Sequence, residues 1–232
     1  MPSMKVNDLS MYYEVYGEGD PLVLIAGLGS DSQDNRSLIR ELSLKYRVIT
    51  FDNRGVGRTD KPDSPYTIEM MSEDTAGLLN SLGVKQAHVL GISMGGRIAL
   101  DLALQHPELV KSLILTSTYA RQAIGTSLPF QVRLWIRIKN HPLKKYPQPY
   151  SAFLRQLKAS RGYDCNDRLD QIMVPTLILH GENDKLVPCW LAEEMHNSIN
   201  SSRMITFDGG HSFFVPENRR FAEEVSAFLH SL

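Results

Sequence analysis

One serine in this sequence has the surroundings of a nucleophile. Ser93 is the centre of residues 91–95 (GISMG), which follow an apolar run directly and precede an Ala/Leu-rich stretch. Strand, tight turn and helix in this order form the context in which G-x-S-x-G holds a strained serine hydroxyl above the strand end. The Met94 N–H, at the start of the helix, would point at a developing oxyanion. The pattern predicts that Ser93 attacks a carbonyl carbon.

A serine hydroxyl needs a base, and seven histidines are available. His211 stands in residues 209–211 (GGH), just after an apolar run that ends at residue 207. It would lie at the carboxyl edge of a sheet, where active-site residues of open α/β sheets gather, and we predict that it is the base. Five other histidines fall at element ends, on helices or in an inserted region, and we expect surface or capping roles for them: His88, His106, His141, His196 and His230.

The base needs an acid that orients it. Asp184 ends residues 181–184 (GEND), just beyond the apolar run 176–179, which places it at the same sheet edge as Ser93 and His211. Glu182 and Asp208 are rivals, but Asp208 is so close to His211 in sequence that it would need a reversed loop to reach Nδ1. We therefore predict Asp184.

The chain order of nucleophile, acid and base is the order found in α/β-hydrolases. Residues 51–57 (FDNRGVG) also resemble the D-x-R-G-x-G turn of that family. On these motifs the sequence resembles the α/β-hydrolase fold superfamily. Its motifs are most similar to those of the esterase, enol-lactonase-like and cofactor-free haloperoxidase branches. The resemblance covers nearly the whole chain outside residues 121–161. A serine rather than an aspartate at position 93 argues against the epoxide-hydrolase and haloalkane-dehalogenase branches.

Residues 26–29 (AGLG) stand where the family usually has His-Gly-x-Gly. The resemblance implies that the Leu28 N–H is the second oxyanion donor, beside the Met94 N–H. Because Ala26 replaces the histidine, the sequence does not indicate which hydrogen bonds hold this loop. The alternative to an oxyanion donor is that the glycines have a structural role only. The residues expected to contact the substrate are Gly27, Tyr119, Trp135 and Val187.

The elements that position these residues follow from the apolar runs. Residues 4–6 and 11–16 predict an antiparallel hairpin. Six compact apolar runs predict buried parallel strands, at residues 22–26, 47–51, 87–92, 112–116, 176–179 and 204–207. Helical patterns are found at residues 69–82, 97–105 and 221–229. This alternation predicts a three-layer α/β-hydrolase sandwich with a mostly parallel eight-stranded sheet.

Residues 117–175 interrupt the alternation. We predict a short helical cap there, inserted into a core formed by residues 1–116 and 176–232, with helices near residues 129–139 and 151–159. A short cap leaves the pocket open or completed by a second subunit. Five apolar cap residues would pack on the core, face acyl groups or meet a partner: Leu134, Trp135, Ile138, Phe153 and Leu157.

Charge is concentrated in the inserted region. Residues 121–161 hold nine Lys or Arg and no Asp or Glu, although the whole chain has a formal charge of −1. A solvated helix face, attraction of an anionic substrate and an acidic partner surface all remain open. No recognition motif accompanies the cations, so we expect no nucleic-acid partner.

Composition limits the other classes. With 232 residues, 42% hydrophobic and 22% charged, the chain is typical of one globular domain. The longest apolar stretch, residues 22–28, is far below the ~20 residues of a membrane span, and the first residues lack a secretory signal, so we expect a cytoplasmic protein with no membrane partner. The two cysteines, Cys165 and Cys189, form no ligand cluster, and we expect neither metal nor cofactor.

The sequence thus predicts a serine hydrolase that cleaves small carboxylic esters or lactones through an acyl-enzyme, and an anionic substrate is left open. Carbon–carbon bond hydrolysis and perhydrolase or haloperoxidase-like activity are alternatives with the same triad. A ligand-binding receptor or scaffold on the same fold is the alternative outside enzymes. A homodimer formed through the cap is also left open.

Overall fold

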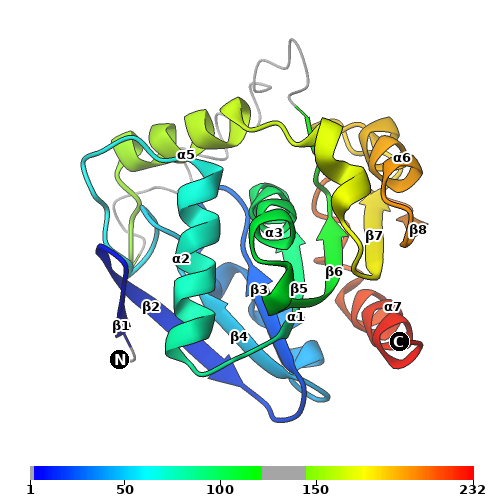
Figure 1. Ribbon diagram of the computed structural model, residues 1–232, viewed down its shortest axis with the longest axis horizontal. Helices are drawn as coiled ribbons and strands as arrows, with labels where there is room; N and C mark the ends of the chain where they lie inside the picture. The colour runs from blue at the N-terminus through cyan, green and yellow to red at the C-terminus, as the bar shows by residue number, and fades with distance from the viewer. Residues whose placement is uncertain (1–2, 122–144) are drawn as a thin grey trace.

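The computed structural model describes residues 3–121 and 145–232. Its centre is one eight-stranded sheet with the order β1-β2-β4-β3-β5-β6-β7-β8 (Figure 1). The first two pairs at one edge of the sheet, β1–β2 and β2–β4, are antiparallel, and every other pair is parallel. The strands are β1 (Ser3–Val6), β2 (Leu9–Tyr16), β3 (Pro21–Ile25), β4 (Arg47–Phe51), β5 (Ala87–Ile92), β6 (Val110–Thr116), β7 (Thr176–Gly181) and β8 (Ser202–Phe207).

Helices cover both faces of the sheet and make it the middle layer of three (Figure 1). One hydrophobic cluster joins the sheet to α2 (Ile68–Ser81), α3 (Met94–Gln105) and α6 (Cys189–Ser198). A second cluster joins the other face to α1 (Arg36–Leu42) and α7 (Asn218–His230). Because both faces are covered, the central strands β3, β5, β6 and β7 are buried along nearly their whole length and are mostly apolar.

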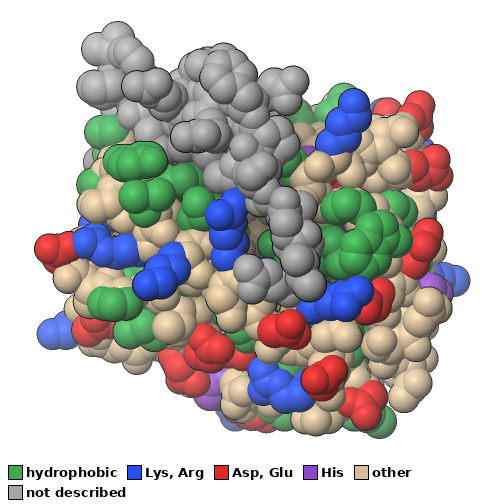
Figure 2. All heavy atoms as spheres, turned by 90° about the horizontal axis from the view of Figure 1, so that it is seen from above, with side chains coloured by type: hydrophobic (Ala, Val, Ile, Leu, Met, Phe, Trp, Pro, Cys, Tyr) green, Lys and Arg blue, Asp and Glu red, His purple; other side chains and the backbone are tan. Residues whose placement is uncertain are grey.

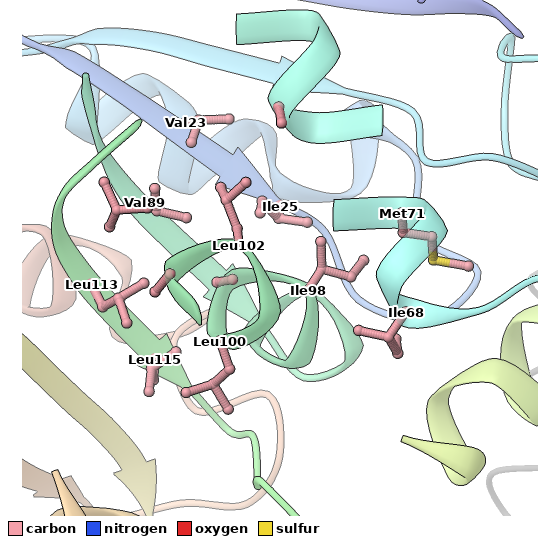
Figure 3. Packing of buried hydrophobic residues seen from close by; sticks show 14 of the residues in the cluster. Val23, Ile25, Ile68, Met71, Val89, Ile98, Leu100, Leu102, Leu113 and Leu115 are labelled. Atoms are coloured by element: carbon pink, nitrogen blue, oxygen red, sulfur yellow. The ribbon is translucent and has the colours of Figure 1, made fainter. Parts of the chain in front are cut away.

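The packing of the first cluster fixes the helix that follows the candidate nucleophile. Ile98 and Leu102 of α3 point toward Val23 and Ile25 of β3 and Val89 of β5 (Figure 3). All five side chains are fully buried. Burying a side chain of this size contributes roughly 1.5 to 3 kcal/mol, so α3 is firmly held against the strands that end at the site.

All the predicted strands and the helices predicted at residues 69–82, 97–105 and 221–229 are present, and several of them have longer ends than the sequence indicated. Helix α3 begins at Met94 rather than at residue 97, because the tight turn leads straight into it. Helices α1 and α6 were missed. Helix α1 has only seven residues, and its start is fixed by a short 3₁₀ helix (Ser32–Asn35) capped by Asp31 rather than by a long apolar repeat. No helix within the described ranges is long and apolar enough to cross a membrane.

The region between β6 and β7 is described in part. The predicted helix near residues 151–159 is present as α5 (Tyr150–Gly162), which lies across the top of the sheet in Figure 1. A 3₁₀ helix (Asn166–Gln171) follows and buries Leu169 in the first cluster. The helix predicted near residues 129–139, with Leu134, Trp135 and Ile138, lies outside the described residues.

Candidate active site

Ser93 sits in a strained turn between β5 and α3. Its backbone has φ 55° and ψ −115°, a conformation that a residue with a side chain rarely adopts. A Cβ on Gly95 would clash with the Ile25 carbonyl oxygen, so the glycine of the motif is needed where α3 begins beside β3. The Ser93 N–H donates to the Thr116 carbonyl at 2.8 Å, which ties the turn to the end of β6. The turn therefore holds the Ser93 hydroxyl at the carboxyl ends of the strands.

His211 lies between Ser93 and Asp184. Its Nε2 is 3.0 Å from Ser93 Oγ, and its Nδ1 is 2.8 Å from Asp184 Oδ2. A carboxylate only accepts hydrogen bonds, so Nδ1 carries the proton and Nε2 of the neutral ring accepts from the serine hydroxyl. The Ser117 hydroxyl donates to the His211 carbonyl at 2.9 Å and fixes the loop that carries the ring. The three residues predicted from the sequence are thus brought together.

Asp184 is held by its own loop. Its Oδ1 accepts from the N–H groups of Leu186 at 2.8 Å and Val187 at 3.0 Å, and its side chain has no exposed surface. Burial by itself raises the pKa of Asp184, but the hydrogen bond and charge of His211 and the two N–H groups outweigh burial and lower it. The carboxylate therefore stays ionised opposite the His211 ring.

The two alternative acids, Asp208 and Glu182, form hydrogen bonds with residues other than His211. Asp208 accepts from the Asn183 side chain at 3.2 Å, and Glu182 accepts from the Thr206 hydroxyl at 2.7 Å. Neither forms a hydrogen bond with His211 among the described residues. Asp184 is thus the carboxylate in contact with His211 in this part of the chain.

Of the five histidines for which surface or capping roles were expected, four are described, and the expectation for one of them was wrong. His88 is almost fully buried, and its Nδ1 lies 2.8 Å from the Ser112 hydroxyl on the neighbouring strand. A surface or capping role was expected because His88 stands at the start of a strand, but strand β5 is covered on both faces. His106, His196 and His230 lie at or near helix ends, as expected, and His141 lies outside the described residues.

His180 was missed by sequence reasoning. It is fully buried at the end of β7, and its Nε2 donates to the Val187 carbonyl at 2.9 Å. The same nitrogen is 3.6 Å from Asp184 Oδ2. Burial lowers the pKa of His180, so the ring is neutral. His180 therefore holds the loop of Asp184 through the Val187 carbonyl. The feature of the sequence that could have indicated this role is its position four residues before the predicted acid.

The loop after β3 lies beside the nucleophile. A Cβ on Gly27 would be 3.4 Å from Ser93 Cβ, which places this residue against the serine. The Ser30 N–H donates to the Gly27 carbonyl at 3.1 Å, and the Gly29 N–H donates to the Gln156 side chain at 3.1 Å. The two N–H groups after Leu28 are thus occupied within the protein. Leu28, which is expected to supply the second oxyanion N–H, lies between Gly27 and Gly29 in this loop.

Hydrogen bonds from two other segments hold this loop where the family histidine is absent. Asn53, in the predicted D-x-R-G-x-G turn, donates from Nδ2 to the Ala26 carbonyl at 3.1 Å. Gln156 of α5 accepts from Gly29 and donates from Nε2 to the Arg54 carbonyl at 2.8 Å. Sequence reasoning missed Gln156, although it lies on the buried stripe of α5 with Ala152, Phe153 and Ala159, where a polar residue is unexpected.

The four residues expected to contact the substrate differ in their exposure and in their contacts. Tyr119 is partly exposed and follows Thr118, whose hydroxyl donates to the Ser93 carbonyl at 2.7 Å. Gly27 lies next to Ser93, as described above. Val187 is buried, and its N–H binds Asp184. Trp135 lies outside the described residues.

The face above the site is rich in cations and apolar side chains. Seen from above, Lys and Arg side chains lie beside exposed hydrophobic ones (Figure 2). Tyr150 and Leu154 of α5 are 66% and 42% exposed. A hollow of about 420 Å³ is lined by five residues of α5: Leu154, Leu157, Lys158, Arg161 and Gly162.

Two protein families match this chain. The α/β-hydrolase fold family matches residues 20–153, and a family described as TAP-like protein matches residues 156–232. A protein of Azorhizobium caulinodans named putative carbamate hydrolase RutD is 31% identical, and the match covers 98% of each chain. The chain therefore belongs to the α/β-hydrolase fold family and is a hydrolase of that family.

Solved structures share the fold over nearly the whole chain. An enol-lactonase from Burkholderia xenovorans LB400 superposes with a TM-score of 0.87 at 23% identity, covering 99% of this chain and 100% of that one. An esterase from Exiguobacterium antarcticum superposes with a TM-score of 0.85 at 26% identity, covering 98% of both. The three-layer α/β-hydrolase architecture predicted from the sequence is thus confirmed.

Proposed function

We propose that this protein is a serine hydrolase that cleaves carboxylic esters or lactones through a Ser93, His211 and Asp184 triad. The observation that carries the proposal is the continuous chain of contacts from Ser93 Oγ to His211 Nε2 at 3.0 Å and from His211 Nδ1 to Asp184 Oδ2 at 2.8 Å. A nucleophile, a base and an orienting acid within hydrogen-bond reach form the arrangement that activates a serine hydroxyl.

In the first half-reaction, Ser93 Oγ attacks the carbonyl carbon while His211 Nε2 accepts the hydroxyl proton. The carbonyl oxygen becomes an oxyanion, which the Leu28 and Met94 N–H groups stabilise. Met94 is the first residue of α3, so its N–H has no acceptor within the helix and carries the positive end of the helix dipole. When the tetrahedral intermediate collapses, His211 returns the proton to the leaving alkoxide oxygen.

The second half-reaction repeats these steps with water. His211 Nε2 accepts a proton from water, whose oxygen attacks the acyl carbon of the Ser93 ester. Collapse of the second intermediate returns the proton to Ser93 Oγ and releases the carboxylic acid. Asp184 keeps the His211 ring in one tautomer throughout and stabilises its protonated form.

A covalent probe tests the assignment of the nucleophile. A fluorophosphonate should label the wild-type protein at Ser93, as located by mass spectrometry of the labelled peptide, and should not label a Ser93→Ala variant. Equal labelling of both proteins, or none of the folded wild type, would overturn the proposal and favour a ligand-binding role on the same fold.

Carbamate hydrolysis is the second candidate, because the relative at 31% identity is named putative carbamate hydrolase. A carbamate offers the same carbonyl to Ser93, but nitrogen donation makes that carbon less electrophilic. Turnover of a phenyl carbamate and of the matching phenyl ester under one set of conditions distinguishes the candidates. A kcat/KM at least equal for the carbamate would favour this second function.

A further inference from the structure

A second serine near the nucleophile has a strained backbone. Ser117 directly follows β6, and its φ of 48° lies in the left-handed region, which residues with a side chain rarely adopt. Among the described residues with a side chain, only Asn7 and Ser93 share this property. Asn7 stands in the turn between β1 and β2, where asparagine is common, and Ser93 is the proposed nucleophile. Strained residues cluster at functional sites, so the strain of Ser117 needs an explanation.

The hydroxyl of Ser117 binds the loop of the base. It donates to the His211 carbonyl at 2.9 Å, although the two residues are 94 positions apart. Ser117 is fully buried, so no bulk water is available to replace this hydrogen bond. Its N–H donates to the Leu179 carbonyl at 3.1 Å and extends the pairing of β6 with β7 by one residue. Ser117 thus ties the loop of the base to the end of the sheet.

The residues on either side of Ser117 hold the turn of the nucleophile. The Thr116 carbonyl accepts from the Ser93 N–H at 2.8 Å, and the Thr118 hydroxyl donates to the Ser93 carbonyl at 2.7 Å. Both threonines are fully buried. A Cβ on Gly96 would lie 2.5 Å from the Thr118 side chain, so Thr118 packs directly on the first turn of α3. Both polar groups of the Ser93 backbone are therefore bound by the residues next to Ser117.

The left-handed turn at Ser117 makes these contacts compatible with one another. If β6 continued, each further residue would carry the chain about 3.3 Å beyond the ends of the neighbouring strands. The positive φ turns the chain instead, and Thr118 then binds the Ser93 carbonyl. Residues 116–118 thus join the turn of Ser93 to the loop of His211, whose Nε2 lies 3.0 Å from Ser93 Oγ.

A structural role alone is the simpler explanation, because the chain must leave the sheet here and a buried carbonyl needs a donor. Glycine would make the same left-handed turn without steric cost. Serine keeps the strain and adds a hydroxyl, and that hydroxyl binds the residue that carries the base. The two explanations differ in one respect: a structural role requires that activity follow stability.

We infer that Ser117 is a positioning residue, which acts through His211 and sets the distance between His211 Nε2 and Ser93 Oγ. This inference rests on the proposed function, because it takes His211 as the base for Ser93. Without the hydroxyl, the His211 carbonyl loses its donor and the loop shifts. Proton transfer from Ser93 then becomes slower, while the binding of the substrate is unchanged.

Two substitutions separate the hydroxyl from the strain. Ser117→Gly removes the hydroxyl and relieves the backbone, so the melting temperature should stay within about 4 °C. We expect its kcat to fall about 10- to 100-fold with KM within about threefold, because small misplacements of a catalytic group have effects of this size. Ser117→Thr keeps a hydroxyl but places a β-branched residue at positive φ. Its melting temperature should fall further than that of Ser117→Gly, while kcat stays within about threefold of wild type.

Two further variants complete the kinetic test. Ser117→Ala keeps the strain without the hydroxyl, so its kcat should equal that of Ser117→Gly although it is less stable, and this pair suffices if Ser117→Thr does not fold. Thr75→Val removes a buried hydroxyl that donates to the Met71 carbonyl at 2.8 Å within α2, and should leave kcat within about twofold. If kcat follows melting temperature across the series, or if Ser117→Gly keeps the wild-type kcat, the inference is overturned.

Proton NMR separates this inference from the proposed function, because it needs no turnover. The His211 Nδ1–H, in its hydrogen bond to Asp184, should give a far-downfield signal that is absent in His211→Gln. In Ser117→Gly we expect this signal to broaden or shift, and an unchanged signal would overturn the inference whatever the kinetics. If the signal changes but Ser93→Ala retains wild-type turnover, the proposed function fails and the ring still depends on Ser117. If Ser93→Ala is inactive but Ser117→Gly has the wild-type signal and kcat, the positioning role fails alone.

Discussion

The Gln156 side chain accepts a hydrogen bond from the Gly29 N–H at 3.1 Å and thereby joins α5 to the loop beside Ser93. It also donates to the Arg54 carbonyl at 2.8 Å, and it is fully buried. One cap side chain therefore bridges the loops that follow β3 and β4. The inserted region thus helps to position the loop of Leu28, which we propose as an oxyanion donor.

Replacing Gln156 should slow catalysis more than it weakens binding. In Gln156→Leu the Gly29 N–H loses its acceptor, and the Leu28 N–H shifts relative to the oxyanion. We expect kcat to fall about 10- to 100-fold with KM within about threefold, because small misplacements of a catalytic donor have effects of this size. Steady-state kinetics on one p-nitrophenyl ester measures both constants.

Two variants control for loss of packing. Gln156→Glu keeps an acceptor for the Gly29 N–H and should recover part of kcat. Gln86→Leu removes a glutamine that binds the Val110 carbonyl at 3.4 Å, at the far end of β5, and should leave kcat unchanged. If Gln156→Leu changes only the melting temperature, the residue has a structural role alone.

Substitutions of Asp184 and Asp208 test which of these two carboxylates orients His211. Asp184→Asn should lower kcat roughly 10⁴-fold, because the amide favours the wrong His211 tautomer and cannot stabilise the imidazolium. Asp208→Asn should change kcat less than about twofold, since Asp208 pairs with Asn183 rather than with His211. A large loss in Asp208→Asn together with an active Asp184→Asn would reverse the assignment.

Two buried histidines make stability depend on pH. Burial lowers the pKa of both His88 and His180, and for His88 the nearby Lys111 adds to the effect while Asp20 opposes it. Below about pH 6.5 the unfolded chain binds protons at these rings that the folded protein does not, so the free energy of unfolding falls as pH falls. The loss approaches about 1.4 kcal/mol per pH unit for each ring.

Urea unfolding at pH 7.5, 6.5 and 5.5 measures this slope. We expect the free energy of unfolding to decrease toward pH 5.5, and to decrease less in His88→Gln, which can still bind the Ser112 hydroxyl. Identical slopes in wild type and His88→Gln would show that His88 does not contribute.

Gly95 tests the packing behind the nucleophile. Gly95→Ala places a Cβ against the Ile25 carbonyl, and backbone cannot yield as a flexible side chain can, so we expect a loss of at least about 2 kcal/mol of stability. Gly162→Ala is the matched control, because no atom lies within 4 Å of its added Cβ. Thermal unfolding should therefore show a large drop for the first variant and none for the second.

The parts that sequence could predict are those fixed by local pattern. Residues 91–95 specify a turn that only a strand-to-helix junction can adopt, and the apolar runs around them specify buried strands. Because parallel strands end at one edge, Asp184 and His211 could be placed with Ser93 before any distance was known. The predicted contacts among these three residues are present in the structure.

The parts that sequence could not predict depend on long-range contacts. Gln156 meets Gly29 across 127 positions, and no local periodicity encodes that pairing. The burial of His88 could not be predicted because it depends on a neighbouring strand, β6, whose Ser112 hydroxyl contacts the ring.

The most direct test of the account is steady-state hydrolysis of p-nitrophenyl esters from C2 to C12, with a small lactone panel, by wild type and Ser93→Ala. Circular dichroism and melting temperature establish that the variant is folded. We predict that wild type cleaves short esters or lactones and that Ser93→Ala loses nearly all turnover, about 10³-fold or more. Equal turnover by the two folded proteins would contradict the triad as the catalytic centre.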